Sequence, residues 1–265
     1  MAIEVTELRV YPVKSFGVFQ AERWEIEKRG LKWDRRWMVV DDAGQFLSQR
    51  NTPKMARCQQ SIRHNILTLS FLDLPDFTLS PPSGPETMMV QVWSSRLRAI
   101  KCGADADAWV SQALGVSAHL VYMAENSRRP VRYPYGEKGE FTSFADAHPI
   151  LVAGEESLQD LNDRMDSPVP INRFRPNIII RGANAFQEDS WPRIKIGDVI
   201  LRATKPCGRC SVTTLDHLTG ESQSAEPLRT LATYRRVGSS VRFGMYYVPE
   251  VLGEIRVGDP VEVLP

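Results

Sequence analysis

The sequence predicts a mainly β protein with a few helices, and two patterns along the chain carry this prediction. Through the N-terminal part, apolar side chains recur at every second position, which is the period of a half-buried strand. Turn-forming clusters such as Asp41-Asp42-Ala43-Gly44 interrupt these runs, at intervals of roughly 8–12 residues that are typical of a β-sandwich or barrel. Few stretches show the 3.6-residue period of a helix.

The composition is that of a folded globular protein. The chain has 265 residues, of which 42% are hydrophobic and 25% charged. The 33 Lys and Arg residues nearly balance the 32 Asp and Glu residues, so no overall positive field favours nucleic acid. Any anion site must therefore arise from local clustering of basic residues.

The chain shows no pattern typical of a membrane or secreted protein. No apolar run approaches the roughly 20 residues of a transmembrane helix, and the N-terminus lacks the regions of a signal peptide. Four cysteines in a chain of this length do not suggest a disulfide framework. We therefore expect a cytoplasmic location and no association with membranes.

Short strands follow one another through the N-terminal part. The expected strands are Glu4–Lys14, Phe19–Ile26, Trp37–Val40, Asn65–Phe71, Met88–Trp93 and Leu97–Cys102. Because this block ends near Cys102, we divide the chain into an N-terminal β domain, residues 1–103, and a second domain, residues 104–265.

The second domain is expected to combine strands with three helices. The first helix has one apolar face, formed by Ala106, Trp109, Val110, Ala113 and Leu114. Gly115 stands where this helix should end. Further helices are expected over Glu155–Met165 and from Glu226-Pro227, and strands over His119–Met123, Ile150–Ala153, Asn177–Arg181 and Arg242–Val248. The long loop Arg128–Gly139 is of a length that is more often functional.

Two similar segments each predict a β-hairpin. Ile194–Leu201 and Ile255–Val263 both place a Gly-Asp pair between two apolar runs, which is a hairpin signal. We expect the two hairpins to close a barrel.

The pair Cys207-Gly208-Arg209-Cys210 is the sharpest candidate for chemistry, and four interpretations compete. Structural zinc usually takes four Cys or His ligands, so Cys58, Cys102 and His217 would have to converge on the pair. A thioredoxin-like dithiol needs a helix after the pair, whereas the β-branched run Val212–Thr214 favours a strand.

The other two interpretations need no further cysteine. Cys210 could provide a single thiolate for a soft transition metal, with Arg209 beside it stabilising the thiolate. Alternatively, both cysteines are small buried apolar side chains. Spacing alone favours this last, structural interpretation.

Basic residues flank several of the predicted strands. Lys14-Ser15 ends the first strand, Arg35-Arg36 precedes Trp37, and Arg173 and Arg175 precede Ile178. Taken singly, each is a typical surface charge. Guanidinium groups fixed at strand ends also suit the recognition of phosphate.

Six motifs in order give the chain a resemblance to a known family. They are Tyr11-Pro12-Val13-Lys14-Ser15, Asp34-Arg35-Arg36-Trp37, Asn172–Asn177, Cys207–Cys210 with Thr213–Asp216, Phe243-Gly244-Met245-Tyr246, and Val257–Val261. Together they resemble MOSC-domain proteins with an N-terminal MOSC β-barrel domain, and among these the mitochondrial amidoxime-reducing component and its bacterial counterparts. The resemblance implies a MOSC-type β-barrel packed against an N-terminal β-barrel-like domain.

The resemblance also implies a molybdenum cofactor held by one pyranopterin dithiolene. It makes Cys210 the metal ligand and catalytic residue. The pterin and phosphate contacts fall on Lys14, Ser15, Arg35, Ala147, His148, Arg175, Asn177, Gly208, Arg209 and Tyr246. The family usually has small hydroxyl residues before Pro149, whereas this chain has Asp146-Ala147-His148, which implies backbone contacts there.

The function implied is that of an oxidoreductase. It would remove oxygen from the N–O bond of small N-hydroxylated compounds: hydroxylamino-purines, amidoximes and hydroxamic acids. The chain shows no iron–sulfur, haem or dinucleotide motif, so we expect electrons from a separate flavin or iron–sulfur reductase. The alternative is a sulfur carrier, or a cofactor-binding protein without reductase activity, that uses Cys210 as a persulfide or as a cofactor ligand.

Overall fold

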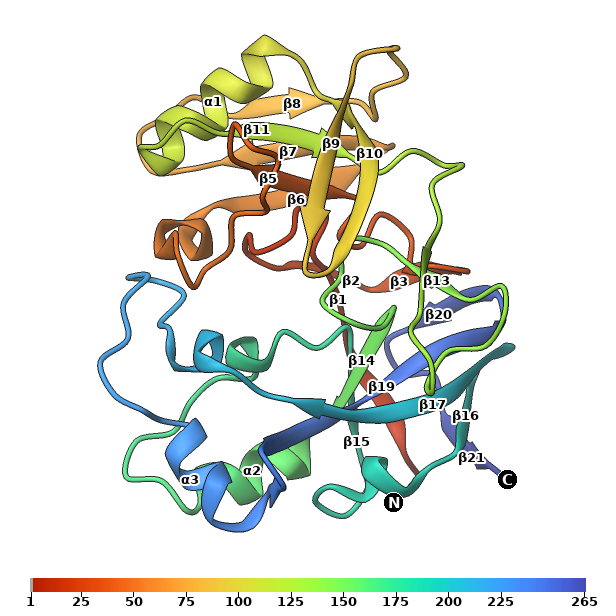
Figure 1. Cartoon of the computed structure of the whole chain (residues 1–265). Helices are drawn as coiled ribbons and strands as arrows, with labels where there is room; N and C mark the ends of the chain where they lie inside the picture. The colour runs from red at the N-terminus through yellow and green to blue at the C-terminus, as the bar shows by residue number, and fades with distance from the viewer. Residues whose placement is uncertain (1) are drawn as a thin grey trace.

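The computed structural model describes residues 2–265 and shows a mainly β molecule in two parts (Figure 1). Among these residues, 40% are in strands and 16% in helices. The predicted fold class is therefore confirmed. No helix in residues 2–265 is both long and apolar enough to cross a bilayer.

The lower part in Figure 1 is built on one large, mostly antiparallel sheet. Its order is β2-β1-β15-β14-β19-β17-β16-β21, and β18 pairs with β19. The strands are β1 (Glu4–Val10), β2 (Phe19–Ala21), β14 (Ile150–Gly154), β15 (Ile178–Arg181), β16 (Arg193–Ile196), β17 (Val199–Gly208), β18 (Arg236–Val237), β19 (Ser240–Val251) and β21 (Val261–Leu264). One sheet face buries Leu8, Ile178, Ile194 and Tyr247, and helices α2 (Glu155–Asn162) and α3 (Leu228–Tyr234) lie against β14, β15 and β19.

The upper part contains two small sheets around a second core. One has the order β5-β11-β10-β9 and the other the order β6-β7-β8. Their strands are β5 (Trp37–Val40), β6 (Gln59–Arg63), β7 (Ile66–Ser70), β8 (Phe77–Leu79), β9 (Thr87–Val92), β10 (Ser95–Lys101) and β11 (His119–Tyr122). Helix α1 (Ala104–Leu114) buries its predicted apolar face in this core and ends at Gly115, whose φ of 75° is the left-handed conformation that glycine favours.

Strands far apart in the sequence pair with each other. β1 pairs with β15 of the lower sheet, although it precedes the whole upper part in sequence. β20 (Gly253–Arg256) pairs with β3 (Arg23–Glu27), which also pairs with β4 (Gly30–Leu31), and Ile26 and Ile255 of this small sheet are buried in the core of the lower part. The short pair β12 (Arg129–Pro130) and β13 (Phe141–Thr142) frames the predicted functional loop.

The division predicted at residues 103 and 104 falls directly before α1. α1 contacts β11, and β11 pairs with both β5 and β10 of the upper part. These contacts favour a division after β11, and the boundary itself stays a prediction.

Two local predictions were wrong. The segment Ile194–Leu201 forms the expected hairpin, β16–β17, but β20 and β21 pair with β3 and β16 instead of with each other. The Gly258-Asp259 turn between them hydrogen-bonds to Val5 of β1. The run after Cys210 is a 3₁₀ turn (Ser211–Thr214) rather than a strand, because the Thr213 and Thr214 hydroxyls donate to carbonyls three residues back.

Candidate functional site

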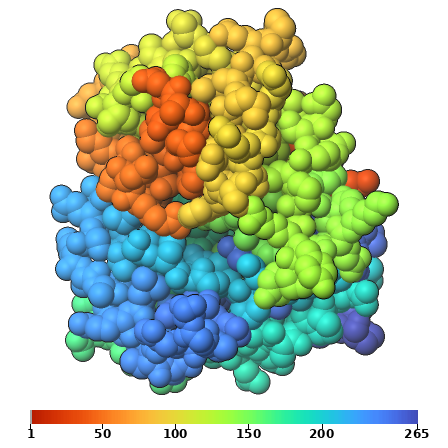
Figure 2. Space-filling view, in the orientation of Figure 1, coloured from red at the N-terminus to blue at the C-terminus, as the bar shows by residue number. Residues whose placement is uncertain are grey.

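A cavity of about 520 Å³ lies where the two parts meet. In Figure 2 the surface is hollowed there, between the orange and yellow upper part and the blue lower part. Every site residue predicted from the sequence lines it: Lys14, Ser15, Arg35, Ala147, His148, Arg175, Asn177, Gly208, Arg209, Cys210 and Tyr246. Residues far apart in the chain are therefore brought to one place.

The cavity wall is strongly basic. Its charged residues within the described chain are Lys14, Arg35, Arg50, Arg175, Lys205, Arg209 and Arg242, against one carboxylate, Asp146. Fixed cations in a partly enclosed site favour a bound anion such as a phosphate.

Lys14 is buried in this wall, in the segment that follows β1. Its Nζ donates to the Phe144 carbonyl at 2.9 Å and to Asp146 Oδ1 at 2.5 Å. Burial lowers the pKa of Lys14, and Asp146 opposes that fall. The Lys14 ammonium also outweighs the effect of burial on Asp146 and holds the pKa of that carboxyl below its usual range. The pair ties the first strand to the loop before β14.

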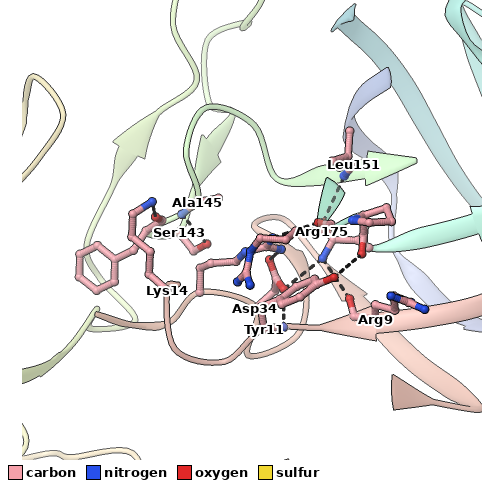
Figure 3. Close-up of polar contacts among 12 residues, drawn as sticks. Arg9, Tyr11, Lys14, Asp34, Ser143, Ala145, Leu151 and Arg175 are labelled. Carbon is pink, nitrogen blue, oxygen red and sulfur yellow. Dashed lines mark hydrogen bonds and ion pairs between the residues drawn. The ribbon is translucent and has the colours of Figure 1, made fainter. Parts of the chain in front are cut away.

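Arg175 lies over the ring of Tyr11 (Figure 3), and Arg35 lies over the same ring. The guanidinium carbons of Arg35 and Arg175 are 4.2 and 4.3 Å, respectively, from the centroid of Tyr11. Arg35 also pairs with the fully buried Asp34 at 2.6 Å. Both arginines have a left-handed backbone, with φ of 49° and 54°, which turns their side chains out of regular strand geometry.

Arg175 is a partly buried cation with an unused hydrogen-bond donor. Nη1 donates to the Phe16 carbonyl at 2.7 Å, whereas Nη2 is buried with no hydrogen-bond partner. Burial lowers the pKa of Arg175 to about 10. An unpaired guanidinium N–H in a cavity wall fits an anionic ligand, because a native buried donor normally has a partner.

The side-chain amide of Asn177 is hydrogen-bonded within the protein and is not left free to bind a ligand. Its Nδ2 donates to the Arg9 carbonyl and to Asp34, and its Oδ1 accepts from the Leu151 backbone N–H. The amide thus joins β1, β14 and the start of β15, and braces the wall behind Arg175.

The two cysteines lie at the end of β17 in different surroundings. Cys207 is buried, and Arg209 Nη1 donates to its Sγ at 2.7 Å. Cys210 is partly exposed, and Arg50 Nη2 lies 3.1 Å from its Sγ. The Arg209 guanidinium, expected from the sequence to act on Cys210, hydrogen-bonds to Cys207 Sγ and to the Phe174 carbonyl.

Aromatic rings complete the site. His148 stacks on Tyr246 with centroids 5.1 Å apart. Burial, together with nearby cations led by Lys205, lowers the pKa of His148 to about 4. Burial also raises the pKa of Tyr246. Both rings are therefore uncharged near neutral pH.

Sequence reasoning missed several lining residues: Gln49, Arg50, Trp93, Tyr135, Lys205 and Arg242. Arg50 and Trp93 reach the cavity from turns in the upper part, where nothing in the local pattern marks them. Tyr135 had a signal, because it belongs to the Arg128–Gly139 loop.

No three His, Cys, Asp or Glu side chains within residues 2–265 lie close enough to hold a metal ion. The thiol, the basic wall and the unpaired Arg175 N–H fit a cofactor with an anionic group.

The chain matches two family models, both of MOSC domains. Residues 2–117 match the MOSC N-terminal beta barrel domain, and residues 140–262 match the MOSC domain. The chain therefore belongs to the MOSC-domain family that carries this N-terminal barrel, and the resemblance seen in the sequence is confirmed.

Within this family, the chain is similar to amidoxime-reducing proteins. It is 36% identical to mitochondrial amidoxime-reducing component 1 of Mus musculus, over 98% of this chain and 82% of the relative. Identity is 34% to the Homo sapiens protein of that name and 32% to component 2 of Bos taurus, each over 82% of the relative. These relatives are named for the reduction of amidoximes.

Proposed function

We propose that this protein is a molybdenum-cofactor-dependent reductase of N-hydroxylated compounds. Family membership and the amidoxime-reducing relatives support an enzyme of this kind. The observation that carries the proposal is the cavity, which is lined by the partly exposed Cys210 thiol together with seven cationic side chains. The proposed substrates are hydroxylamino-purines, amidoximes and hydroxamic acids.

Different residues would bind different parts of such a cofactor. Cys210 would supply the protein thiolate to the metal, and Lys14, Arg35 and Arg175 would bind the anionic end. Ser15, Ala147, His148, Asn177, Gly208, Arg209 and Tyr246 line the space between. When bound, the cofactor supplies two-electron redox chemistry at its metal, and the protein supplies orientation and electrostatics.

The chain's own groups prepare this cavity for an anion. Arg175 offers its unpaired N–H, and the Tyr11 ring holds it beside Arg35. Arg50 places a cation 3.1 Å from Cys210 Sγ, the atom that would bind a soft metal. His148 and Tyr246 exclude water with an uncharged surface.

Turnover also requires electrons from elsewhere. Reduction of an N–O bond consumes two electrons and two protons, and releases water with the amine or amidine. We propose a separate flavin or iron–sulfur reductase as the donor, and we retain the cytoplasmic location as a prediction from the sequence.

Metal analysis and anaerobic turnover test the proposal together. We expect near-stoichiometric molybdenum in the purified protein and reduction of an N-hydroxylated purine with a dye reductant. Sulfane sulfur on Cys210 without molybdenum would contradict the proposal and favour a sulfur carrier. Molybdenum without turnover would favour a cofactor-binding protein.

A further inference from the structure

A continuous aromatic wall runs from the interior of the cavity to its mouth. Tyr246 of β19 stacks on His148 at 5.1 Å with an angle of 29° between the rings. Tyr135, from the loop between β12 and β13, meets His148 edge-on at 6.1 Å and 74°. Side chains of the lower sheet and of this loop thus form one apolar surface in an otherwise charged cavity.

The middle ring of this wall has an unsatisfied polar atom. His148 is only 4% exposed, and its Nδ1 has no hydrogen-bond partner. A neutral imidazole carries one donor and one acceptor, and a buried polar atom without a partner is unfavourable. A ligand with its own N–H or O–H group would correct this.

A second exposed ring lines the cavity from the upper part. Trp93 lies at the turn of the β9–β10 hairpin, which points toward the lower part in Figure 1. Its side chain is 40% exposed, close to the 41% of Tyr135. Trp93 Nε1 donates to Asp146 at 3.2 Å, which fixes the indole at the cavity wall.

Both exposed rings are covered by long cationic side chains. Arg50 lies over Trp93 at 4.7 Å, and Lys205 lies over Tyr135 at 5.0 Å. Each ring nevertheless stays about two-fifths exposed, so a flat neutral ring packed beside these cations would bury aromatic area that they leave in contact with water. The same cations disfavour a positively charged ligand.

We propose that Tyr135 and Trp93 are specificity-determining residues that make the cavity prefer planar, ring-bearing N-hydroxylated substrates to small aliphatic ones. This inference rests on the proposed function, because it concerns the substrate of that same site. The rings would stack on or pack against the substrate ring and leave its N–O group toward the cavity interior.

Two amidoximes with the same reacting group provide the test. Benzamidoxime has a phenyl ring where acetamidoxime has a methyl group, so the ratio of their kcat/KM values reports recognition of the ring. The holoprotein is assayed anaerobically with a dye reductant. We expect Tyr135→Leu and Trp93→Leu each to lower the ratio by about fivefold, as for the loss of one aromatic contact.

Tyr133→Leu is the matched control. Tyr133 lies two residues from Tyr135 on the same loop, is 92% exposed and does not line the cavity. We expect its ratio to equal that of the parent, and Tyr135→Phe, which keeps the ring, to retain most of the ratio. Equal ratios in the parent, Tyr135→Leu and Tyr133→Leu would overturn the inference while the proposed function stands.

Calorimetric titration of benzamidoxime without reductant tests the aromatic site separately from the proposed reductase function. If the holoprotein reduces neither amidoxime, the proposed function fails and binding alone decides the aromatic site. Weaker binding to Tyr135→Leu than to Tyr133→Leu would support that site. Equal binding to both variants would overturn it.

Discussion

Replacing Arg175 with methionine separates the binding of an anion from the stability of the fold. The guanidinium is charged at pH 7 in both the folded and the unfolded chain. Its pKa falls from 12.5 to about 10 on burial, so the folded protein carries a penalty of about 3 kcal/mol. Methionine has a similar length and needs no hydrogen bond, and it relieves this penalty.

The substitution also removes favourable contacts. Arg175 donates to the Phe16 carbonyl and lies over Tyr11, contacts worth about 2–3 kcal/mol together. The two effects nearly cancel. We therefore expect the cofactor-free variant to unfold within about 1 kcal/mol of the parent in urea.

Cofactor content should respond much more strongly. Loss of a charge-assisted hydrogen bond to a bound anion is worth about 1.5–3 kcal/mol, or roughly 10- to 100-fold in affinity. Molybdenum and pterin per protein chain measure this loss. Arg173→Met is the control, because Arg173 pairs with Asp216 and does not line the cavity. Parental molybdenum content in Arg175→Met would refute the assignment of an anion site.

Three further predictions follow from the same cavity. Cys210→Ser should lose activity and molybdenum, whereas Cys207→Ser should retain most of both, since Cys207 is buried against Arg209. Metal analysis and turnover measurements check this expectation. The opposite pattern would make Cys207 the metal ligand. His148 has a pKa of about 4 in the folded chain against an ordinary 6.5, so folding favours the neutral ring and stability declines as the pH falls from about 6.5 to 4. Urea unfolding at pH 7 and pH 5 should show a stability loss about 2 kcal/mol smaller in His148→Gln than in the parent, and an equal loss would contradict a neutral buried ring. NADH or NADPH alone should support no turnover, and a flavin or iron–sulfur reductase or a dye should restore it; turnover by the pure protein with NADH alone would point to a nucleotide site.

Local patterns predicted the local structure well. The run Trp37–Val40 is a strand with the predicted bounds, and Gly115 ends α1 where only a left-handed residue fits. Such features depend on a few neighbouring residues, so sequence reasoning reaches them. The residues of the cavity came from the family resemblance, since spacing alone favoured a structural role for Cys207 and Cys210.

Local sequence patterns could not predict which strands pair when they are far apart in the chain. The segment Ile255–Val263 has the same Gly-Asp signal as β16–β17, but β3 and β1 compete for its backbone and separate its two strands. Local patterns also could not predict which way a side chain points. Arg209 is next to Cys210 in sequence, and yet Arg50, 160 residues away, contacts Cys210 Sγ.

The pairing of strands far apart in the chain has a consequence for biosynthesis. Ile26 of β3 pairs with Gly253 of β20, and Glu4 of β1 pairs with Arg181 of β15. A nascent chain emerges from the ribosome in sequence order, so β1 and β3 meet these partners only late in synthesis. The cavity is lined by residues from Lys14 to Tyr246, so its wall is likewise completed only when nearly all of the polypeptide has been made. Insertion of a cofactor is therefore expected to follow release of the finished chain, and a ribosome stalled before residue 246 would present an incomplete loading site.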